Sequence, residues 1–155
     1  MNLQTIANAI ATVVGQVTAT SSTGETETLT CTADLPDSIG HAALLVYPPE
    51  EATLGLIMGP RYDDHYTFVV RLLRDPLSVT PRTKWLYAWA TALRPKVQAN
   101  VDLDVAGVMQ AEMTFMRVEL DGERYTSAET SQLRDFDVVE IPVDVHVIEN
   151  TSASI

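Results

Sequence analysis

The chain has 155 residues and a formal net charge of −11, from 10 basic and 21 acidic side chains. Such a surface repels nucleic-acid phosphates and anionic lipids, which argues against tight direct binding to nucleic acid. The length and the 46% hydrophobic content predict one domain, residues 1–155, that buries a core without metals or disulfides. The apolar runs are too short for a transmembrane helix. The first residues lack the basic segment of a signal peptide.

Two helices are predicted. In residues 1–14, apolar side chains recur at three- and four-residue steps, and Gly15 follows as a stop. The second helix should begin at Thr80-Pro81, a good N-cap followed by a good first residue. Pro95 removes a helical hydrogen bond, so this helix should end or kink there. Its apolar stripe consists of Trp85, Leu86, Trp89, Ala92 and Leu93.

The threonine-rich segment 16–32 surrounds a Ser/Gly turn, a pattern typical of a β-hairpin. Its strands carry few large apolar side chains, so we expect a protruding hairpin or a partly mobile arm. A neighbouring subunit in an assembly could order such an element. At the other end, the small polar residues 149–155 are expected to form a flexible tail.

Three strands are expected in the middle of the chain. Residues 42–47 are nearly all apolar and should form a central strand that ends at Pro48-Pro49, because proline donates no hydrogen bond to a ladder. Residues 54–58 are another candidate. The third strand begins near Asp63 and ends at Asp75-Pro76. The alternation of its side chains predicts a core face of Tyr66, Phe68, Val70 and Leu72.

Two final strands are expected at 112–120 and 136–148, joined by Asp121-Gly122, a strong turn dipeptide. Alternation in the last strand predicts one wet face and one buried face of Val139, Ile141, Val143, Val145 and Val147. Pro142 on the wet face argues for an edge strand or a bulge. Together the elements predict an α+β fold. It is a single mixed, mostly antiparallel sheet with the N-terminal helix and the Trp-bearing helix on one face, plus the Thr-rich protruding hairpin.

Candidate catalytic or metal-ligating residues are few, and none is assigned to a site. Asp63, Asp64 and His65 could hold a metal ion, but adjacent strand residues point to opposite faces. Only Asp63 and His65 can therefore converge, and a solvated strand start is the simpler interpretation. Carboxylates near each other could also perform acid–base chemistry, although they are common in loops and at strand ends. The pairs are Asp102 with Asp104, and Asp135 with Asp137.

The sequence places no activating residue or catalytic motif beside the other reactive side chains. His41, His65 and His146 are dispersed and are interpreted as surface or boundary residues. Cys31 is the single cysteine, so no intrachain disulfide can form, and we expect a buried, inert thiol. Residues 121–125 could be a ligand loop, but a hairpin tip is the simpler interpretation. No Gly-x-Ser-x-Gly motif or phosphate-binding glycine loop is present. The sequence therefore predicts no catalytic residue, metal or cofactor.

The order of elements carries a family resemblance. A helix and a Thr-rich hairpin precede an apolar strand ending in Val46-Tyr47-Pro48-Pro49, and the strand at 66–71, the helix at 85–93 and two final strands follow. From about Leu3 to Ile148 this arrangement resembles the small tail-terminator and neck proteins of long-tailed bacteriophages. The resemblance implies a structural virion protein, made in the host cytoplasm, and no enzyme activity.

The resemblance also implies partners. The subunit would form a hexameric ring that caps the tail tube, takes part in head–tail joining and contacts the head-side connector. DNA would pass the ring lumen without tight binding, because like charges repel. No membrane partner is expected, and the family offers no sharp motif from which a site residue could be carried over.

Two other interpretations stay open. The chain could be a different virion protein, such as a head-completion factor or the tail-tube subunit. It could also be a non-viral small-molecule-binding or enzyme-accessory α+β domain that acts as a monomer or dimer. Oligomeric state separates a ring protein from an accessory domain, and stacking of rings into tubes separates a tube subunit from a terminator.

Overall fold

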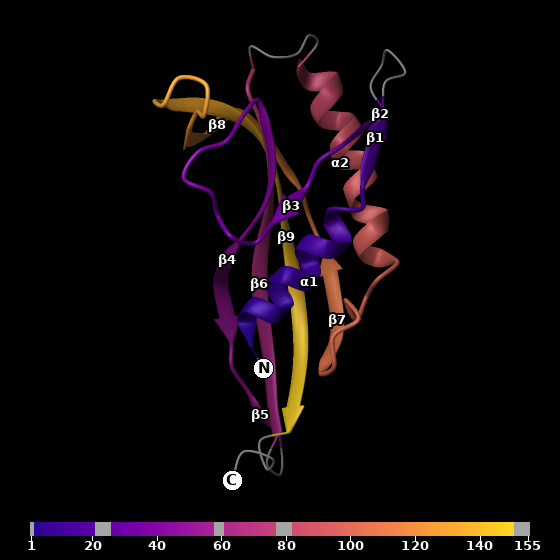
Figure 1. Cartoon of the computed structure of the whole chain (residues 1–155). Helices are drawn as coiled ribbons and strands as arrows, with labels where there is room; N and C mark the ends of the chain where they lie inside the picture. Colours follow the sequence, from indigo (N-terminus) through magenta and orange to yellow (C-terminus); the bar gives the residue numbers. More distant parts are fainter. Residues whose placement is uncertain (1, 21–25, 58–60, 77–81, 151–155) are drawn as a thin grey trace.

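The computed structural model describes residues 2–20, 26–57, 61–76 and 82–150. Within these ranges the chain forms helices α1 (Leu3–Val14) and α2 (Arg82–Gln98), and neither is long and apolar enough to cross a membrane. The strands are β1 (Thr18–Thr20), β2 (Thr26–Thr28), β3 (Cys31–Thr32), β4 (Ala42–Thr53), β5 (Leu56–Ile57), β6 (Arg61–Arg74), β7 (Val108–Met113), β8 (Arg117–Thr126) and β9 (Leu133–Asn150). Figure 1 shows the two helices beside one long sheet, which confirms the predicted α+β class.

Strands β6 and β9 form the spine of the main sheet. They pair in antiparallel register from Arg61 with Asn150 to Arg74 with Asp137. The strand order is β3-β4-β6-β9-β7. On one side β4 and β5 pair with successive parts of β6, and on the other β7 and β8 pair with successive parts of β9. Only the β3–β4 pairing among the described strands is parallel, so the sheet is mixed and mostly antiparallel, as predicted.

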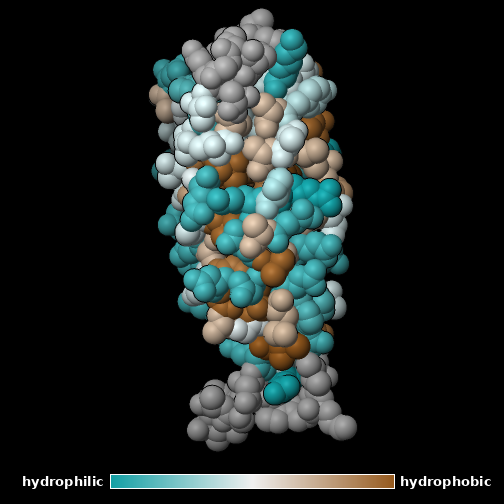
Figure 2. All heavy atoms as spheres, turned by 90° about the vertical axis from the view of Figure 1, so that its right-hand side faces the viewer, coloured by the Kyte–Doolittle hydropathy of each residue, from teal (hydrophilic) through white to brown (hydrophobic). Residues whose placement is uncertain are grey.

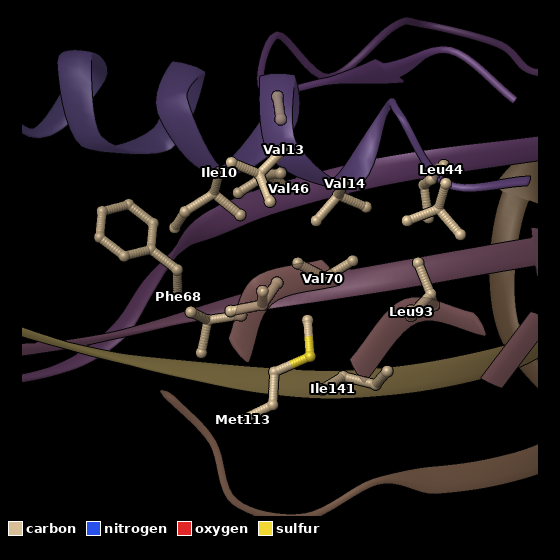
Figure 3. Close-up of a cluster of buried hydrophobic side chains, with 14 of the residues drawn as sticks. Ile10, Val13, Val14, Leu44, Val46, Phe68, Val70, Leu93, Met113 and Ile141 are labelled. Carbon is tan, nitrogen blue, oxygen red and sulfur yellow. The ribbon is translucent and has the colours of Figure 1, made fainter. Parts of the chain in front are cut away.

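Both helices contribute to a single large core on one face of the sheet. Helix α1 begins after Asn2, whose side chain accepts the Gln4 N–H at 2.8 Å, and is capped by Gly15. Figure 3 shows Ile10, Val13 and Val14 of α1 directed at the strands. The predicted apolar faces are confirmed, with Tyr66 and Ala92 only partly buried. The fully or nearly fully buried members are Phe68, Val70, Leu72, Trp85, Leu86, Trp89, Leu93, Val139, Ile141, Val143, Val145 and Val147.

The opposite face of the sheet, here called the outer face, is not exposed to solvent along its whole length. A smaller apolar cluster covers one end of it and consists of Ile39, Leu45, Leu73, Phe136 and Val138. Ile39 reaches this cluster because its backbone bonds to Thr126 and Ala128 at the end of β8. The sequence assigned Val138 to the wet face of the last strand, and this part of that prediction is wrong.

The prediction from Pro48-Pro49 is also wrong. Strand β4 does not end at Pro48-Pro49. Its register shifts between Tyr47, opposite Val69, and Glu51, opposite Thr67. The extra residues form a bulge that takes both prolines out of the regular ladder. For Pro95 the sequence allowed an end or a kink of the helix. Helix α2 does not end there but continues to Gln98, and the fully buried Val97 packs its last turn against the core.

Pro142 does not mark an edge strand, since β9 lies between β6 and the line of β7 and β8. That outer line is interrupted beside Pro142: β7 pairs as far as Val143, and β8 begins its pairing at Glu140. No residue of β7 or β8 therefore pairs with Pro142. Because proline lacks an N–H, its position in this gap removes no hydrogen bond to those strands.

Asp121-Gly122 is not the turn between the last strands. It lies inside β8, where the register shifts between Glu119, opposite Val138, and Glu123, opposite Phe136. Asp121 has a φ of 54°, and its N–H donates to a carboxylate oxygen of the buried Asp137 at 2.9 Å. The dipeptide thus forms a bulge, and residues 127–132 connect β8 to β9. Because 121–125 belong to β8, they form neither a hairpin tip nor a ligand loop.

The Thr-rich hairpin is a separate two-stranded sheet of β1 and β2, beside α2 in Figure 1. The middle of β2 is tied to the rest of the molecule, because the Glu27 carboxylate accepts from Trp85 Nε1 at 2.9 Å and from Arg74 at 3.4 Å. Cys31 and Thr32 belong instead to the main sheet as β3.

Several predicted boundaries fall at or beyond the described ranges. Strand β9 extends through Glu149 and Asn150, which the sequence placed in a flexible tail. The hairpin turn at 21–25, the N-cap Thr80, Met58 and residues 151–155 lie outside the described residues.

The β8 bulge predicts a test of packing. A Cβ atom on Gly122 would lie 2.8 Å from Glu119 Cβ and 2.9 Å from Val138 Cγ1, whereas one on Gly40 would meet nothing within 4 Å. We expect Gly122→Ala to lower the free energy of unfolding by about 1–3 kcal/mol. Gly40→Ala should change it by less than about 0.5 kcal/mol. Urea unfolding at one protein concentration measures both, and equal stability of the two variants would contradict the bulge geometry.

Candidate functional site

Three chemically active side chains meet on the outer face, at the end of the sheet where β9 finishes. His65 of β6 pairs directly with His146 of β9, and Asp63 lies two residues before His65 on the same face. The imidazole rings are stacked, with centroids 4.2 Å apart and planes inclined by 6°. His146 Nε2 lies 2.5 Å from Asp63 Oδ1, and His65 Nε2 lies 3.8 Å from the same oxygen. We call these three residues the His–Asp cluster.

The structure brings together Asp63 and His65, as strand alternation required, and separates them from Asp64. Asp64 lies on the helix-covered face, where it accepts from the Tyr66 hydroxyl at 3.1 Å and from the Gly55 N–H at 3.2 Å. Gly55 also accepts the Asp63 N–H at 3.0 Å, and a Cβ atom on Gly55 would lie 2.6 Å from the Asp63 carbonyl oxygen. Glycine at this position therefore allows the chain to approach the start of the cluster closely.

Sequence reasoning missed His146. It lies 83 residues from Asp63, and its partnership depends on the register of β6 against β9. The alternation in the last strand did place His146 on the face opposite the valines, which is the outer face. No local pattern indicates which residue of a distant strand will lie opposite, so the pairing could not be inferred.

A second polar network occupies the outer face nearer the centre of the sheet. Glu140 of β9 accepts from Arg71 Nε at 2.8 Å and from Arg117 at 3.2 Å. Arg71 also pairs with Glu50 at 3.1 Å, and its guanidinium lies 4.2 Å from the centroid of the Tyr47 ring. Burial raises the pKa of Tyr47 to about 12, with a further contribution from the charge of Glu123. These ionic contacts tie β4, β6, β8 and β9 together.

The network predicts a pH dependence of stability. Burial by itself raises the pKa of Glu140, but the hydrogen bond and charge of Arg71, aided by Arg117, outweigh it and hold the pKa below its usual value. A carboxyl with a depressed pKa stabilises the fold above its unfolded pKa of about 4.3, and this contribution is lost as the pH falls through the folded value. Glu140→Gln should lower the free energy of unfolding near neutral pH by about 1–3 kcal/mol.

The measurement is urea unfolding across a pH series, with Glu112→Gln as the control because Glu112 is an exposed carboxylate of β7. The wild type and the control should lose stability below about pH 4.5 more steeply than Glu140→Gln does. Parallel pH curves for all three proteins would contradict the assigned role of Glu140.

The carboxylates of the two pairs considered from the sequence contact other groups rather than each other's side chains in the interactions below. Asp102 accepts the Asp104 N–H at 3.0 Å, which is a local turn contact in an exposed connection. Asp135 forms an ion pair with Arg124 at 3.4 Å, whereas Asp137 is fully buried and holds the β8 bulge. His41, the third histidine, is exposed, and its carbonyl oxygen accepts the Asp75 N–H at 2.8 Å.

Cys31 is half-buried in β3, and burial raises the pKa of its thiol to about 12. At neutral pH the thiol is therefore protonated, whereas its thiolate is the reactive form. We expect a disulfide reagent such as Ellman's reagent to modify Cys31 at about pH 8 at least about tenfold more slowly in the folded protein than in urea. Equal rates, followed by absorbance in both solvents, would show that the folded environment does not suppress the thiolate.

The outermost strand line of the sheet carries exposed apolar side chains. Met109 of β7, Phe115 and Met116 of the link between β7 and β8, and Leu120 of β8 are between 44% and 61% exposed. We call these four residues the apolar edge.

A cleft of about 220 Å³ lies beside the link, lined mainly by Ala90, Met113, Phe115, Met116 and Ile141. Figure 2 views the side that carries α2 and β7, where hydrophobic side chains interrupt a largely hydrophilic surface.

No protein-family model matches this chain, and no curated protein matches its sequence. Two features of the described surface combine chemistry or apolar area that a ligand or partner could use. One is the His–Asp cluster on the outer face, and the other is the apolar edge on the line of β7 and β8.

Proposed function

We propose that this chain is a structural virion protein of a long-tailed bacteriophage, a tail terminator or neck protein. It assembles into a hexameric ring that caps the tail tube and joins it to the head-side connector. The observation that most supports assembly is the apolar edge, where Met109, Phe115, Met116 and Leu120 are exposed along a sheet edge. The phage identity rests on the order of elements, and the ring acts without enzyme activity or a cofactor.

The apolar edge supports self-assembly because exposed strands are an unfavourable feature in a monomer. Unpaired N–H and C=O groups on such an edge accept a further strand, and large apolar side chains beside it favour burial. The opposite edge of the main sheet is formed by β3 and β4. Contact between two different edges of successive subunits is heterologous, and it closes into a ring when the rotation between subunits permits.

The cleft beside the apolar edge does not favour the small-molecule alternative. Its volume of about 220 Å³ is below the roughly 300–1,000 Å³ typical of ligand pockets. Its lining includes Phe115 and Met116, which belong to the exposed edge itself. The cleft therefore fits a side chain from a neighbouring subunit better than an enclosed ligand.

The charge of −11 per subunit suits a channel through which DNA slides, because an acidic lumen repels phosphates. Glu25, Glu27, Asp102 and Asp104 are acidic residues from which such a lumen could be built. Glu27 is unsuitable for charge neutralisation, since it holds Trp85 and Arg74. Asp102→Asn with Asp104→Asn is the cleaner change, and we expect it to slow DNA passage and reduce infectivity.

Assembly is tested by light scattering after size exclusion, with negative-stain images of the same peak and added purified tail tubes. We expect discrete closed rings, either in solution or on tube ends. Met116→Glu should reduce ring formation or tube-end binding, because it places a charge on the apolar edge. Tyr87→Ser is the control, since Tyr87 is a 57% exposed apolar side chain on α2.

Each result has a defined meaning. Open tubes formed by this chain alone would favour the tube-subunit alternative. A monomer that also fails to bind tube ends would overturn the proposal and favour the accessory-domain alternative. Equal losses in Met116→Glu and Tyr87→Ser would show that the apolar edge has no special role in assembly.

A further inference from the structure

We propose that Asp63, His65 and His146 form a binding site for a divalent transition-metal ion of the zinc type. Each residue offers one ligand atom, and the three atoms all lie within 4.8 Å of one another. Two imidazole nitrogens and one carboxylate oxygen form a donor set that suits zinc, cobalt, nickel or copper. Calcium and magnesium prefer oxygen ligands, so they are poor candidates.

The backbone holds the three ligands in place before any ion binds. His65 and His146 are opposite each other in the β6–β9 ladder, which shows no register shift between Arg61 and Arg74. Thr53 of β4 lies opposite His65, and Gln110 of β7 lies opposite His146, so both histidines are on central strands. A site on such paired strands loses little backbone entropy when it binds an ion.

The spacing of the ligand atoms fits a shared ion after small side-chain movements. Bonds of about 2.0–2.1 Å to a tetrahedral zinc ion place neighbouring ligand atoms about 3.3 Å apart. The observed separations from Asp63 Oδ1 are 2.5 Å to His146 Nε2 and 3.8 Å to His65 Nε2, one below and one above that value.

Ring orientation requires the larger adjustment. The lone pair of an imidazole nitrogen lies in the ring plane, and the two rings here are parallel to within 6°. One ring must therefore turn about its Cβ–Cγ bond so that both nitrogens point at one ion. The His65 side chain is 55% exposed and has room to do so. A fourth, tetrahedral coordination position would be left for water.

The surrounding charge favours a cation. Asp144 lies two residues from His146 on the outer face, with its carboxylate accepting from the Thr67 hydroxyl at 2.8 Å. Glu51 of β4 lies opposite Thr67, and Glu112 of β7 lies opposite Asp144. Arg61, two residues before Asp63 on the same strand face, is the basic residue nearest in sequence. The carboxylates outnumber it, and the net charge of −11 adds to the attraction.

The test is a calorimetric titration of the untagged chain with zinc chloride at about pH 7.5, because a histidine tag would itself bind zinc. We expect one ion per chain, with magnesium giving no binding. His146→Ala and Asp63→Asn should each weaken zinc affinity by about tenfold or more. His41→Ala is the matched control, since His41 is an exposed histidine outside the cluster, and its affinity should equal that of the wild type.

A second readout identifies the ligands directly. Zinc should shift the side-chain ¹⁵N resonances of His65 and His146 in NMR spectra and leave those of His41 unchanged. His65→Ala keeps the Asp63–His146 contact, so it tests the third ligand if His146→Ala fails to fold by circular dichroism.

The proposal is overturned if the wild type binds no stoichiometric zinc, or if the folded His146→Ala or His65→Ala variant binds it as tightly as the wild type. It is also overturned if the zinc-dependent resonance shifts appear at His41 instead. None of these outcomes depends on whether the chain forms a ring on a phage tail.

Discussion

The antiparallel pairing of β6 with β9 is the constraint on which the rest of this structure depends. Its register runs unbroken from Arg61 with Asn150 to Arg74 with Asp137. Because side chains alternate along both strands, one register decides the composition of two surfaces at once. The face that carries Phe68 and Val143 becomes the floor of the main core, and α1 and α2 cover it. The other face carries His65, His146 and the Arg71–Glu140 pair, together with the smaller apolar cluster.

Irregularity is concentrated in the strands that flank this spine. The line of β4 and β5 contains the Pro48-Pro49 bulge and the close approach at Gly55, and the line of β7 and β8 contains a break at 114–116 and the Asp121-Gly122 bulge. A central pair must keep its ladder to avoid unsatisfied backbone groups, whereas outer strands tolerate bulges and breaks. The apolar edge proposed for assembly lies along one of these outer lines, around its break.

The charged residues of the outer face lie in two different environments. Near the centre, Arg71 and Arg117 compensate Glu140, and the resulting ion pairs are short and partly buried. Toward the end of β9, the two histidines and the single carboxylate of the His–Asp cluster lie near Asp144, and Arg61 is the basic residue nearest to them in sequence. The first environment fits a role in stability, because its charges neutralise each other. The second leaves carboxylate charge that a metal ion can balance, which is the physical basis of the proposed site.

Sequence by itself determined the elements whose signal is local. The periodicities of 3.6 and two residues identified the apolar faces of α1, α2, β6 and β9, because burial of those faces follows from chain geometry alone. The predictions from Pro48-Pro49 and Asp121-Gly122 were wrong because these residues are equally compatible with a strand end, a turn or a bulge. Only the packing of the whole chain selects the bulge. Val97 holds the turn after Pro95 in this way.

Only the tertiary structure brings His146 close to Asp63 and His65. These residues come together through a register set by the whole length of β6 and β9, and a slip of one residue would turn His146 to the helix-covered face. Strand alternation could say that Asp63 and His65 share a face, since it acts over two residues. It could not say what lies opposite them, because pairing energy is summed over many distant contacts rather than encoded in any one segment.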